Sequence, residues 1–267
     1  MAHRQNLQDA RRLLAGVRWR AGYMLGTPIP AEYDDELRST IKRVRRHTLS
    51  TAARVAALCD SVTYVVQNEI EGDIVECGVW KGGSMMAAAL TLMRLGDTDR
   101  DLYLFDTFSG MAEPGAEDAP SAYDGGVSPH KRWKRHKEKS GIDDGGSGWA
   151  AISEQRVREA MDSTGYPRER VHLVKGMVEE TIPGGAPDTV ALLRLDTDWY
   201  ASTKHELEQL YPRLSEAGVL IIDDYGHYAG ARQAVDEYFS ESGQPILLNR
   251  IDYTGRVGVK QGARVPV

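Results

Sequence analysis

Four aspartates follow two short apolar runs of the sequence. Asp196 and Asp198 come directly after one run, and Asp223 and Asp224 come after a later one. If both runs are neighbouring parallel strands, these carboxyl groups gather at one edge of a sheet, where two like charges ~4 Å apart repel by ~4 kcal/mol at an effective dielectric of about 20. Such a cluster recruits a counter-charge, and carboxylate oxygens suit a hard divalent cation such as Mg²⁺. The pattern predicts a metal site with Asp196, Asp223 and Asp224 as ligands.

Asp198 is expected to support this site rather than to bind the metal. Together with Ser202 and Thr203 it would cap a helix that starts near Thr203. A single acidic pair after a strand is often no more than a turn or the start of a helix. Two such pairs in tandem favour the metal site.

A second candidate site is the segment from Asp73 to Ser84, whose sequence predicts a strand, a glycine-rich turn and the start of a helix. Glycine lets the backbone turn tightly and lets a ligand approach closely, and Ser84 is expected to be the N-cap of the helix. The glycine spacing differs from the phosphate-binding dinucleotide motif, and the carboxylate of Glu76 would repel a pyrophosphate. A cationic ligand fits better, and S-adenosylmethionine carries an ammonium and a sulfonium but no phosphate. The expected cofactor contacts in this segment are Glu76, Gly78, Val79, Trp80, Gly82, Gly83 and Ser84.

Asp106 ends the next apolar run, roughly 30 residues after Glu76, which is where nucleoside-binding α/β folds place the acid that binds the ribose hydroxyls. Because the two acids end adjacent predicted strands, they are expected to share one pocket. Ser109, in the turn that follows Asp106, is counted with them as a cofactor contact.

From residue 74 onward, short apolar runs alternate with helical patterns. The predicted strands cover residues 74–79, 102–105, 171–174, 190–195 and 219–222, and the clearest helices cover about 50–68, 84–94 and 229–239. This alternation is typical of a mostly parallel sheet with helices on both faces, in which ligands bind at the carboxyl ends of the strands. The predicted fold class is therefore α/β.

The chain is predicted to form a helical extension over residues 1–50 and one α/β domain over residues 51–267. The extension is rich in arginine and shows two amphipathic helical patterns. Within the α/β domain, residues 107–148 form a long polar insertion rich in glycine and proline, which is expected to act as a mobile lid over the site. Its basic run, residues 131–139, is expected to be a solvated helix face.

Composition narrows the expected partners. The chain of 267 residues carries 33 Lys and Arg against 39 Asp and Glu, a formal net charge of -6, so no nucleic acid partner is expected. Cys59 and Cys77 lack zinc-ligand spacing and are expected to be reduced core residues. No stretch has the length and apolar character of a membrane span or signal peptide, so the chain is expected to be cytoplasmic without a membrane partner. A homodimer is expected because symmetric dimers are the commonest oligomers.

Three motifs resemble the macrocin O-methyltransferase family, whose members methylate sugar hydroxyls on macrolide and aminocoumarin antibiotics. The motifs are Glu76-Cys-Gly-Val-Trp-Lys-Gly-Gly83, Asp196-Thr-Asp-Trp-Tyr-Ala-Ser-Thr203, and Leu210-Tyr-Pro-Arg-Leu214 followed by Ile222-Asp-Asp-Tyr225. The resemblance covers roughly residues 47–240 and departs at Thr197, where a glycine is common, and at Ala201, where an acid is common. Residues 1–46 and 110–148 do not match closely, so the acceptor is left open.

The resemblance implies a Rossmann-like class I methyltransferase with a seven-stranded, mostly parallel sheet. It implies a site for S-adenosylmethionine at Glu76–Ser84 and Asp106, and Mg²⁺, or another divalent cation, bound by Asp196, Asp223 and Asp224. It also implies a small glycosylated acceptor and a role in antibiotic biosynthesis.

The predicted reaction is an in-line transfer of a methyl group to a hydroxyl, which requires both reactants to be aligned and the alcohol to become nucleophilic. A bound metal would lower the pKa of the hydroxyl, and a neighbouring group would take its proton. Asp196 is expected to be both ligand and base, and His227, three residues beyond Asp224, is the second candidate for the base. Two alternatives stay open: a metal-dependent phenol or catechol methyltransferase, whose acceptor pocket would be rich in aromatic side chains, and a non-catalytic scaffold protein that keeps the cofactor fold.

Overall fold

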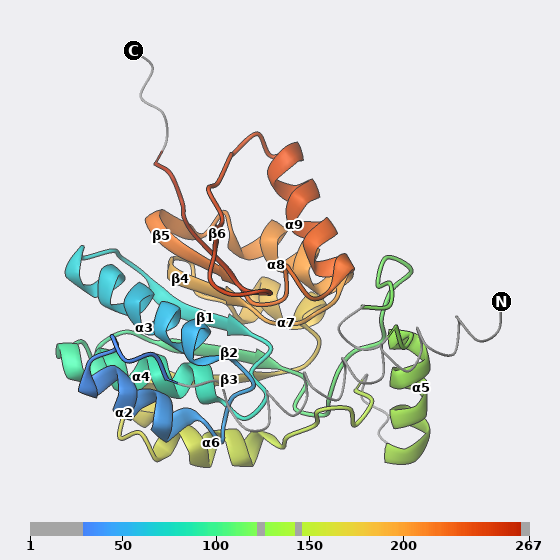
Figure 1. Ribbon diagram of the computed structural model, residues 1–267, viewed down its shortest axis with the longest axis horizontal. Coiled ribbons are helices and arrows are strands. Elements are labelled where there is room, and N and C mark those ends of the chain that lie inside the picture. Colours follow the sequence, from blue (N-terminus) through green and yellow to red (C-terminus); the bar gives the residue numbers. More distant parts are fainter. Residues whose placement is uncertain (1–28, 122–125, 142–145, 263–267) are drawn as a thin grey trace.

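A seven-stranded sheet forms the centre of the computed structural model, which describes residues 29–121, 126–141 and 146–262 (Figure 1). Its strands are β1 (Asp73–Cys77), β2 (Leu102–Asp106), β3 (Val171–Lys175), β4 (Val190–Leu195), β5 (Leu214–Ile222), β6 (Asn249–Arg250) and β7 (Arg256–Val259). The strand order is β3-β2-β1-β4-β5-β7-β6, in which the first five strands are parallel, β7 is antiparallel to β5, and β6 is antiparallel to β7. The predicted α/β fold with a mostly parallel sheet is confirmed.

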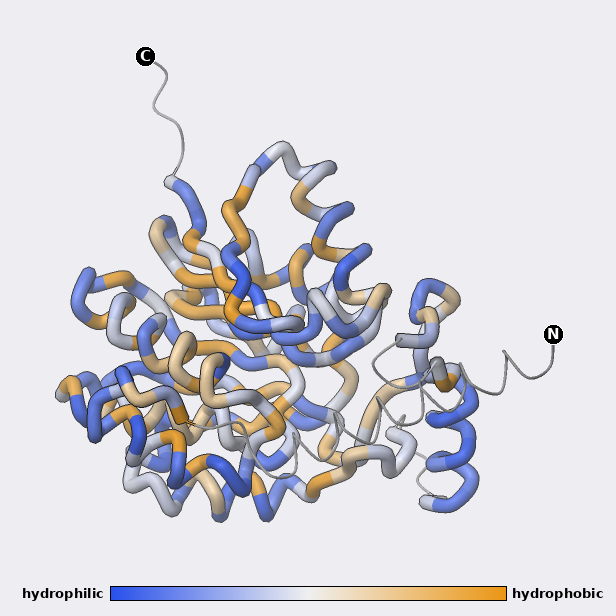
Figure 2. The backbone as a smooth tube through the Cα atoms, viewed as in Figure 1, coloured by the Kyte–Doolittle hydropathy of each residue, from blue (hydrophilic) through white to orange (hydrophobic). Residues whose placement is uncertain are grey.

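Helices cover both faces of this sheet (Figure 1). One face carries α2 (Asp35–Val44), α3 (Ala52–Gln67), α4 (Gly83–Leu95) and α6 (Glu154–Asp162), and the other carries α7 (Val178–Gly185), α8 (Tyr200–Leu210) and α9 (Ala229–Glu241). Successive residues of a strand point to opposite faces. Ile74 and Leu192 therefore join the core beneath the first group of helices, and Val75 and Leu193 join the core beneath the second. Figure 2 shows this apolar interior as the orange strands between the more polar outer helices.

Helix α4 starts one residue earlier than predicted. It begins at Gly83, and its N-cap is Gly82, which adopts a left-handed φ of 80°. The Gly83 N–H donates to the His47 carbonyl oxygen (2.9 Å), so a backbone group and not a capping side chain satisfies it. The prediction of Ser84 as the N-cap is therefore wrong.

Helix α8 also starts earlier than predicted. It begins at Tyr200 with Trp199 as the N-cap residue, so a start near Thr203 capped by Asp198 is wrong. The Tyr200 N–H donates instead to Asp118 Oδ1 (3.0 Å). Asp118 belongs to the insertion, far away in the sequence, so no local pattern reveals this cap.

The described parts of the two poorly matching regions each contain one helix. In the extension, α2 packs against α3 and α4, and the first predicted helical pattern lies outside the described residues. In the insertion, α5 (Pro129–Ser140) stands beside the main body of the fold (Figure 1). Cys59 and Cys77 are buried with free thiols, as predicted. Within the ranges that the structure describes, no helix is both long and apolar enough to cross a membrane.

Candidate active site

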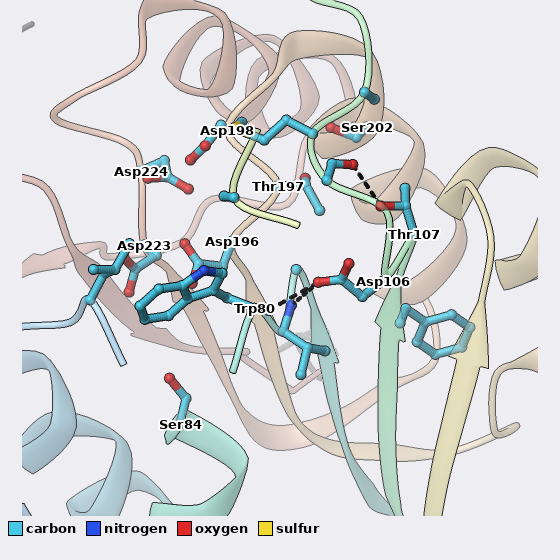
Figure 3. A pocket seen from close by; sticks show the side chains of 18 of the residues that line it. Trp80, Ser84, Asp106, Thr107, Asp196, Thr197, Asp198, Ser202, Asp223 and Asp224 are labelled. Carbon is cyan, nitrogen blue, oxygen red and sulfur yellow. Dashed lines mark hydrogen bonds between the residues drawn. The ribbon is translucent and has the colours of Figure 1, made fainter. Parts of the chain in front are cut away.

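A cavity of about 400 Å³ opens at the carboxyl ends of the central strands, the edge at which parallel sheets bind ligands. It brings the predicted cofactor segment and the predicted acidic cluster into one space (Figure 3). The predicted site residues that line it are Gly78, Val79, Trp80, Gly83, Ser84, Asp106, Asp196, Asp223, Asp224 and His227, together with Asp198.

Three predicted cofactor contacts, Glu76, Gly82 and Ser109, are not among the described residues that line this cavity. Glu76 is 1% exposed and lies against a buried arginine, and Ser109 is buried against Gly146 of the insertion, where an added Cβ would come within 2.2 Å of the serine Oγ. Glu76 and Ser109 thus contact groups from distant segments of the chain, and contacts of Glu76, Gly82 and Ser109 with the cofactor stay a prediction.

The glycines of the β1–α4 turn are required by the chain's own packing. Gly78 has a φ of 84°, and a Cβ there would lie 2.0 Å from the Asp196 carbonyl oxygen at the end of β4. A Cβ on Gly83 would lie 2.5 Å from the His47 carbonyl group. No larger side chain fits at either position, so these glycines bring the turn close to β4 and to the segment before α3.

Asp106 fixes the conformation of the same turn. Its Oδ2 accepts hydrogen bonds from the Val79 N–H (2.7 Å) and the Trp80 N–H (3.0 Å), and its Oδ1 accepts from the Phe108 N–H (2.8 Å). Figure 3 shows the carboxylate at the end of β2 beside the loop that carries Trp80. Trp80 has a left-handed φ of 47°, which is unfavourable for a residue with a side chain, and the bond from Asp106 helps to hold it there. A further role of Asp106 in binding ribose stays a prediction.

Arg194 is a buried cation beneath the acidic end of the cavity. It is 2% exposed and pairs in the sheet with Glu76 of β1. Its Nη1 donates to Glu76 Oε1 (2.5 Å) and to Asp196 Oδ2 (2.7 Å), and its Nη2 donates to Asp223 Oδ1 (2.5 Å). One guanidinium therefore ties together the ends of three adjacent strands.

Arg54 supplies a second guanidinium from α3. Its Nη1 pairs with Asp223 Oδ2, and its Nε lies 3.1 Å from Asp252 Oδ2. Both oxygens of Asp223 thus accept a hydrogen bond from an arginine. This partnership gives Asp223 a charge-balancing position that the sequence did not reveal.

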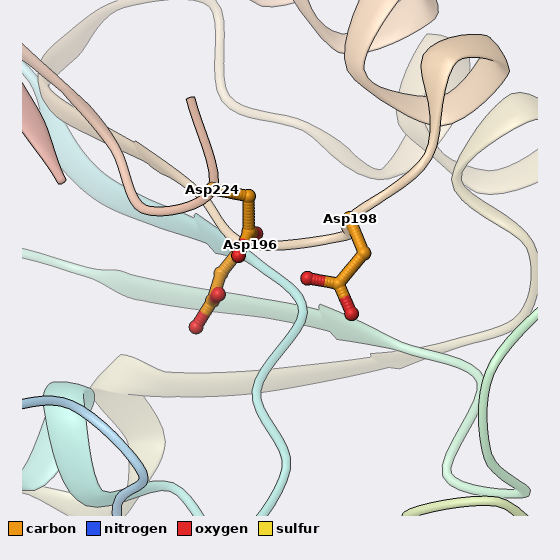
Figure 4. Close-up of side chains that lie close together, drawn as sticks. All are labelled: Asp196, Asp198 and Asp224. Atoms are coloured by element: carbon orange, nitrogen blue, oxygen red, sulfur yellow. The ribbon is translucent and has the colours of Figure 1, made fainter. Parts of the chain in front are cut away.

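The carboxyl groups of Asp196, Asp198 and Asp224 form the group that could hold a metal ion in the described part of the chain (Figure 4). One oxygen from each lies within 4.8 Å of the others. This trio differs from the predicted set because Asp198 stands in the place of Asp223. We call the acidic floor the set of Glu76, Asp196, Asp198, Asp223 and Asp224 with Arg54 and Arg194.

Charge is not balanced across the acidic floor, because two guanidinium groups face more carboxyl groups than they can neutralise. Burial raises the pKa of Asp196 well above its usual range; Arg194 opposes this, and the charges of Asp223 and Asp224 reinforce it. Burial also raises the pKa of Asp224, helped by the charge of Asp198 and a hydrogen bond to it. For Asp223, burial alone would raise the pKa, but the two arginines hold it below its usual value. Among Asp196, Asp223 and Asp224, the neighbouring arginines outweigh the effect of burial on the pKa at Asp223 but not at the other two.

Aromatic side chains form another part of the cavity lining. His227 Nδ1 lies 3.0 Å from the Tyr253 hydroxyl oxygen, and its ring packs edge-on against Tyr228, with the centroids 4.4 Å apart. The chain of ring contacts continues from Tyr228 to Trp199 (5.2 Å) and from Trp199 to Trp149 (5.9 Å). We call these five residues the aromatic wall. His227, the second predicted base, is thus held with its ring at the cavity.

Sequence reasoning missed Arg54, Arg194 and Trp149. A signal was present for Arg194, because a charged residue inside the otherwise apolar run Val190–Leu195 must find buried partners. Arg54 carries no such mark within its amphipathic helix. Trp149 lies at the end of an insertion whose course the sequence does not determine.

Comparison with known proteins identifies the family. The family model described as Macrocin-O-methyltransferase (TylF) matches residues 30–258. The chain belongs to the macrocin O-methyltransferase family.

Relatives in this family have similar lengths and folds. The 8-demethyl-8-(2,3-dimethoxy-alpha-L-rhamnosyl)-tetracenomycin-C 4'-O-methyltransferase of Streptomyces olivaceus is 35% identical over 209 residues, which cover 78% of this chain and 74% of the relative. The demethyldecarbamoylnovobiocin O-methyltransferase of Streptomyces niveus is 31% identical over 207 residues, which cover 76% and 73%. The solved structure of the O-methyltransferase NovP is 28% identical, with a TM-score of 0.69, and the match covers 95% of this chain and 100% of that chain.

Family and fold together assign the general activity. Members of the macrocin O-methyltransferase family are O-methyltransferases, and the sheet and its cavity belong to a class I, S-adenosylmethionine-dependent enzyme. This chain is therefore an S-adenosylmethionine-dependent O-methyltransferase, as the resemblance implied.

Proposed function

We propose that this methyltransferase transfers the methyl group of S-adenosylmethionine to a sugar hydroxyl of a small glycosylated natural product, with a divalent cation bound at the acidic floor. The main support for the cation is the trio Asp196, Asp198 and Asp224 in the cavity lining. The support for the sugar is a family relative that is named for a rhamnosyl tetracenomycin. A role in antibiotic biosynthesis follows from the same relatives.

The donor set fits a hard cation such as Mg²⁺. It consists only of carboxylate oxygens, and Asp224 Oδ2 is buried without a hydrogen-bond partner among the described residues. Asp196 and Asp224 belong to both the predicted set and the observed trio, and we propose Asp198 as the third ligand. When bound, Mg²⁺ would supply Lewis acidity that lowers the pKa of the acceptor hydroxyl.

The chain's own residues align the reactants and accept the proton. We propose that Asp196 takes the proton of the acceptor hydroxyl, since its carboxyl group lies at the cavity beside the other two proposed metal ligands. His227, which the Tyr253 hydroxyl orients through Nδ1, is the second candidate. Arg194 and Arg54 act beneath the site by fixing the positions of Asp196 and Asp223.

A phenol or catechol acceptor is the second candidate function. The aromatic wall is the feature expected for a flat aromatic acceptor, and four of its residues line the cavity. Aromatic rings also pack against the apolar face of a sugar, so the wall suits both acceptor classes. The family relatives favour the sugar.

Methyl transfer from labelled S-adenosylmethionine tests these proposals on a panel of rhamnosides and catechols. We expect transfer to rhamnosides in Mg²⁺ and its loss in excess chelator. Asp196→Asn or Asp224→Asn should lower turnover at least a thousandfold while calorimetry still detects cofactor binding, and the matched change Asp188→Asn, at an exposed position, should have no effect. Full activity in chelator would refute the metal, and transfer to catechols alone would favour the second candidate. No transfer to any acceptor despite cofactor binding would indicate a scaffold.

The third metal ligand is identified by a matched pair of variants. Asp198→Asn should weaken Mg²⁺ binding at least tenfold, measured by calorimetry with the metal. Asp223→Asn should mainly destabilise the fold, because it leaves Arg54 and Arg194 with less negative charge. The reverse pattern would restore Asp223 as the ligand.

A further inference from the structure

The turn between β6 and β7, residues 251–255, forms part of the cavity lining. Tyr253 and Thr254 line the cavity, and Tyr253 belongs to the aromatic wall. The strand before this turn, β6, consists of two exposed residues. A pair of strands this short contributes little stability of its own. The position of Tyr253 must therefore depend on other contacts of the turn.

Asp252 fixes the backbone of this turn. Its Oδ1 accepts hydrogen bonds from the Thr254 N–H (2.9 Å) and the Gly255 N–H (2.8 Å). The Ile251 N–H donates to the Gly255 carbonyl oxygen (3.0 Å), which closes the turn. Aspartate commonly stabilises turns in this way, by accepting from the backbone two residues further on. The Asp252 side chain thus holds the backbone that carries Tyr253.

The other oxygen of Asp252 attaches the turn to the start of α3. Asp252 Oδ2 accepts a hydrogen bond from the Thr51 hydroxyl (2.8 Å) and lies 3.1 Å from Arg54 Nε. Thr51 is the N-cap residue of α3, and Arg54 also pairs with Asp223 of the acidic floor. One carboxyl group therefore joins the turn to a helix that lies far away in the sequence.

The same turn packs against the segment that carries His227. The Gly226 N–H donates to the Thr254 carbonyl oxygen (2.9 Å), and a Cβ on Gly226 would lie 2.0 Å from the Tyr253 carbonyl oxygen. Glycine at 226 is thus required for this close approach. The Thr254 hydroxyl also donates to the Asp223 carbonyl oxygen (2.7 Å). These contacts bring the backbone of Tyr253 next to the residue that precedes His227.

Tyr253 in turn contacts the His227 ring. Its hydroxyl oxygen lies 3.0 Å from His227 Nδ1, and the two rings meet edge to face with their centroids 5.9 Å apart. A hydrogen bond at one ring nitrogen sets the tautomer of a histidine and helps to orient its ring. A displaced turn would therefore alter the placement of the imidazole. Asp252 is not among the described residues that line the cavity, so it can affect the reaction only through residues that do.

We propose that Asp252 is a positioning residue of the active site, which fixes the β6–β7 turn so that the Tyr253 hydroxyl holds the His227 ring where it meets the acceptor. The inference assigns control of the contact between Tyr253 and His227 to a carboxyl group outside the cavity lining. Its kinetic consequence rests on the proposed role of His227 in the reaction. The placement of the ring does not, and it can be measured without an acceptor.

Nitrogen-15 spectra of the histidine rings in the full chain test this placement, with the His227 signals assigned by their loss in His227→Gln. Tyr253→Phe should shift the His227 Nδ1 signal, because it removes the hydroxyl, and Asp252→Ala should shift it in the same direction by a comparable amount. Tyr225→Phe and Asp236→Ala are the matched controls and should leave the signal unchanged. The Tyr225 hydroxyl donates to Asp236 Oδ1 (2.7 Å), and neither residue is among the described residues that line the cavity.

Methyl transfer to the rhamnosides of the acceptor panel provides the second measurement. Tyr253→Phe and Asp252→Ala should each lower kcat at least tenfold, while the dissociation constant of S-adenosylhomocysteine should change less than twofold. Because both changes act on one contact, the double variant should be no slower than the slower single variant. A residue that only stabilises the fold would not produce this pattern.

Urea unfolding identifies the variants that remain folded. Asp252→Asn keeps an oxygen for the N–H groups of the turn but loses the charge that faces Arg54, so it should shift the His227 signal in the same direction by a smaller amount. An unchanged His227 signal in every folded Asp252 variant would overturn the inference, and so would losses of kcat that multiply in the double variant. Asp252-dependent placement of His227 in a protein that methylates no sugar would keep the placement and refute the proposed function instead.

Discussion

The acidic floor and the aromatic wall with α5 enclose one cavity but are built in different ways. The floor comes from the ends of β1, β4 and β5, and Arg194 joins its carboxyl groups at the centre of the sheet. The far end comes from an insertion, where Arg132 and His136 are placed by stacking on Trp149. The floor is thus part of the sheet itself, whereas the far end is attached to the sheet domain by contacts from the insertion. Under the proposed function, we expect catalysis at the floor and acceptor choice at the insertion.

Removing one arginine from each region should give the largest difference in the free energy of unfolding. Arg194→Met leaves three carboxyl groups without their shared cation, and loss of one partner from a buried ion pair typically costs about 3–5 kcal/mol. Arg132→Met should cost less than about 1 kcal/mol, because its contact lies outside the core. Urea unfolding measures both. The loss in Arg194→Met should be smaller at pH 5 than at pH 8, since protonated carboxyl groups repel each other less, and equal losses for the two variants would abolish the distinction.

The titration of Glu76 should make the stability of the acidic floor depend on pH. Its pKa is raised from 4.5 to about 7, chiefly by burial, which outweighs the favourable charge of Arg194. Between these pH values the unfolded chain has released a proton that the folded chain keeps, so the free energy of unfolding falls as pH rises from about 4.5 to about 7. Glu76→Gln cannot titrate and should lose less stability over this interval, by roughly 2 kcal/mol. Urea unfolding at pH 5 and pH 7.5 provides the measurement, and parallel profiles for the two proteins would contradict it.

Asp198→Asn should give the smallest effect, and one of opposite sign. The charge of Asp198 raises the pKa of Asp224, so its removal relieves a repulsion and should stabilise the metal-free chain by roughly 1 kcal/mol at pH 8. Asp188→Asn, at an exposed position, serves as the control with no expected change. Thermal unfolding in chelator compares the two, and a less stable Asp198→Asn protein would mean that the floor does not carry excess negative charge.

The floor was largely predictable because its signals are local. Apolar runs ending in aspartate place Asp196, Asp223 and Asp224 at one sheet edge whatever the rest of the chain does. The difference in surroundings between Asp223 and the other two was not predictable. It depends on Arg54, which contacts Asp223 from a helix far away in the sequence. The clustered carboxyl groups do gather positive charge, which Arg54 and Arg194 supply, and the bound divalent cation stays a prediction.

The position of the insertion was not predictable, because the signals that fix it are not local. Its polar sequence indicates a loop and one basic helix, but its position depends on contacts made far along the chain, such as Trp199 Nε1 with the Ala112 carbonyl oxygen (3.0 Å). Ser109 is an example. This residue is close to Asp106 in sequence and is expected at the cofactor site, but its burial against Gly146 could not be read from the sequence.

Asp118 has a consequence for engineering. It accepts from the first N–H of α8 and packs so closely on Gly230 of α9 that a Cβ there would lie 1.9 Å from its Oδ1. A chimera that exchanges the insertion for that of another family member must therefore bring an aspartate to this position and keep glycine at 230. With both residues retained, the exchanged insertion can make the same contacts with α8 and α9. A new acceptor pocket can then be placed beside an unchanged acidic floor.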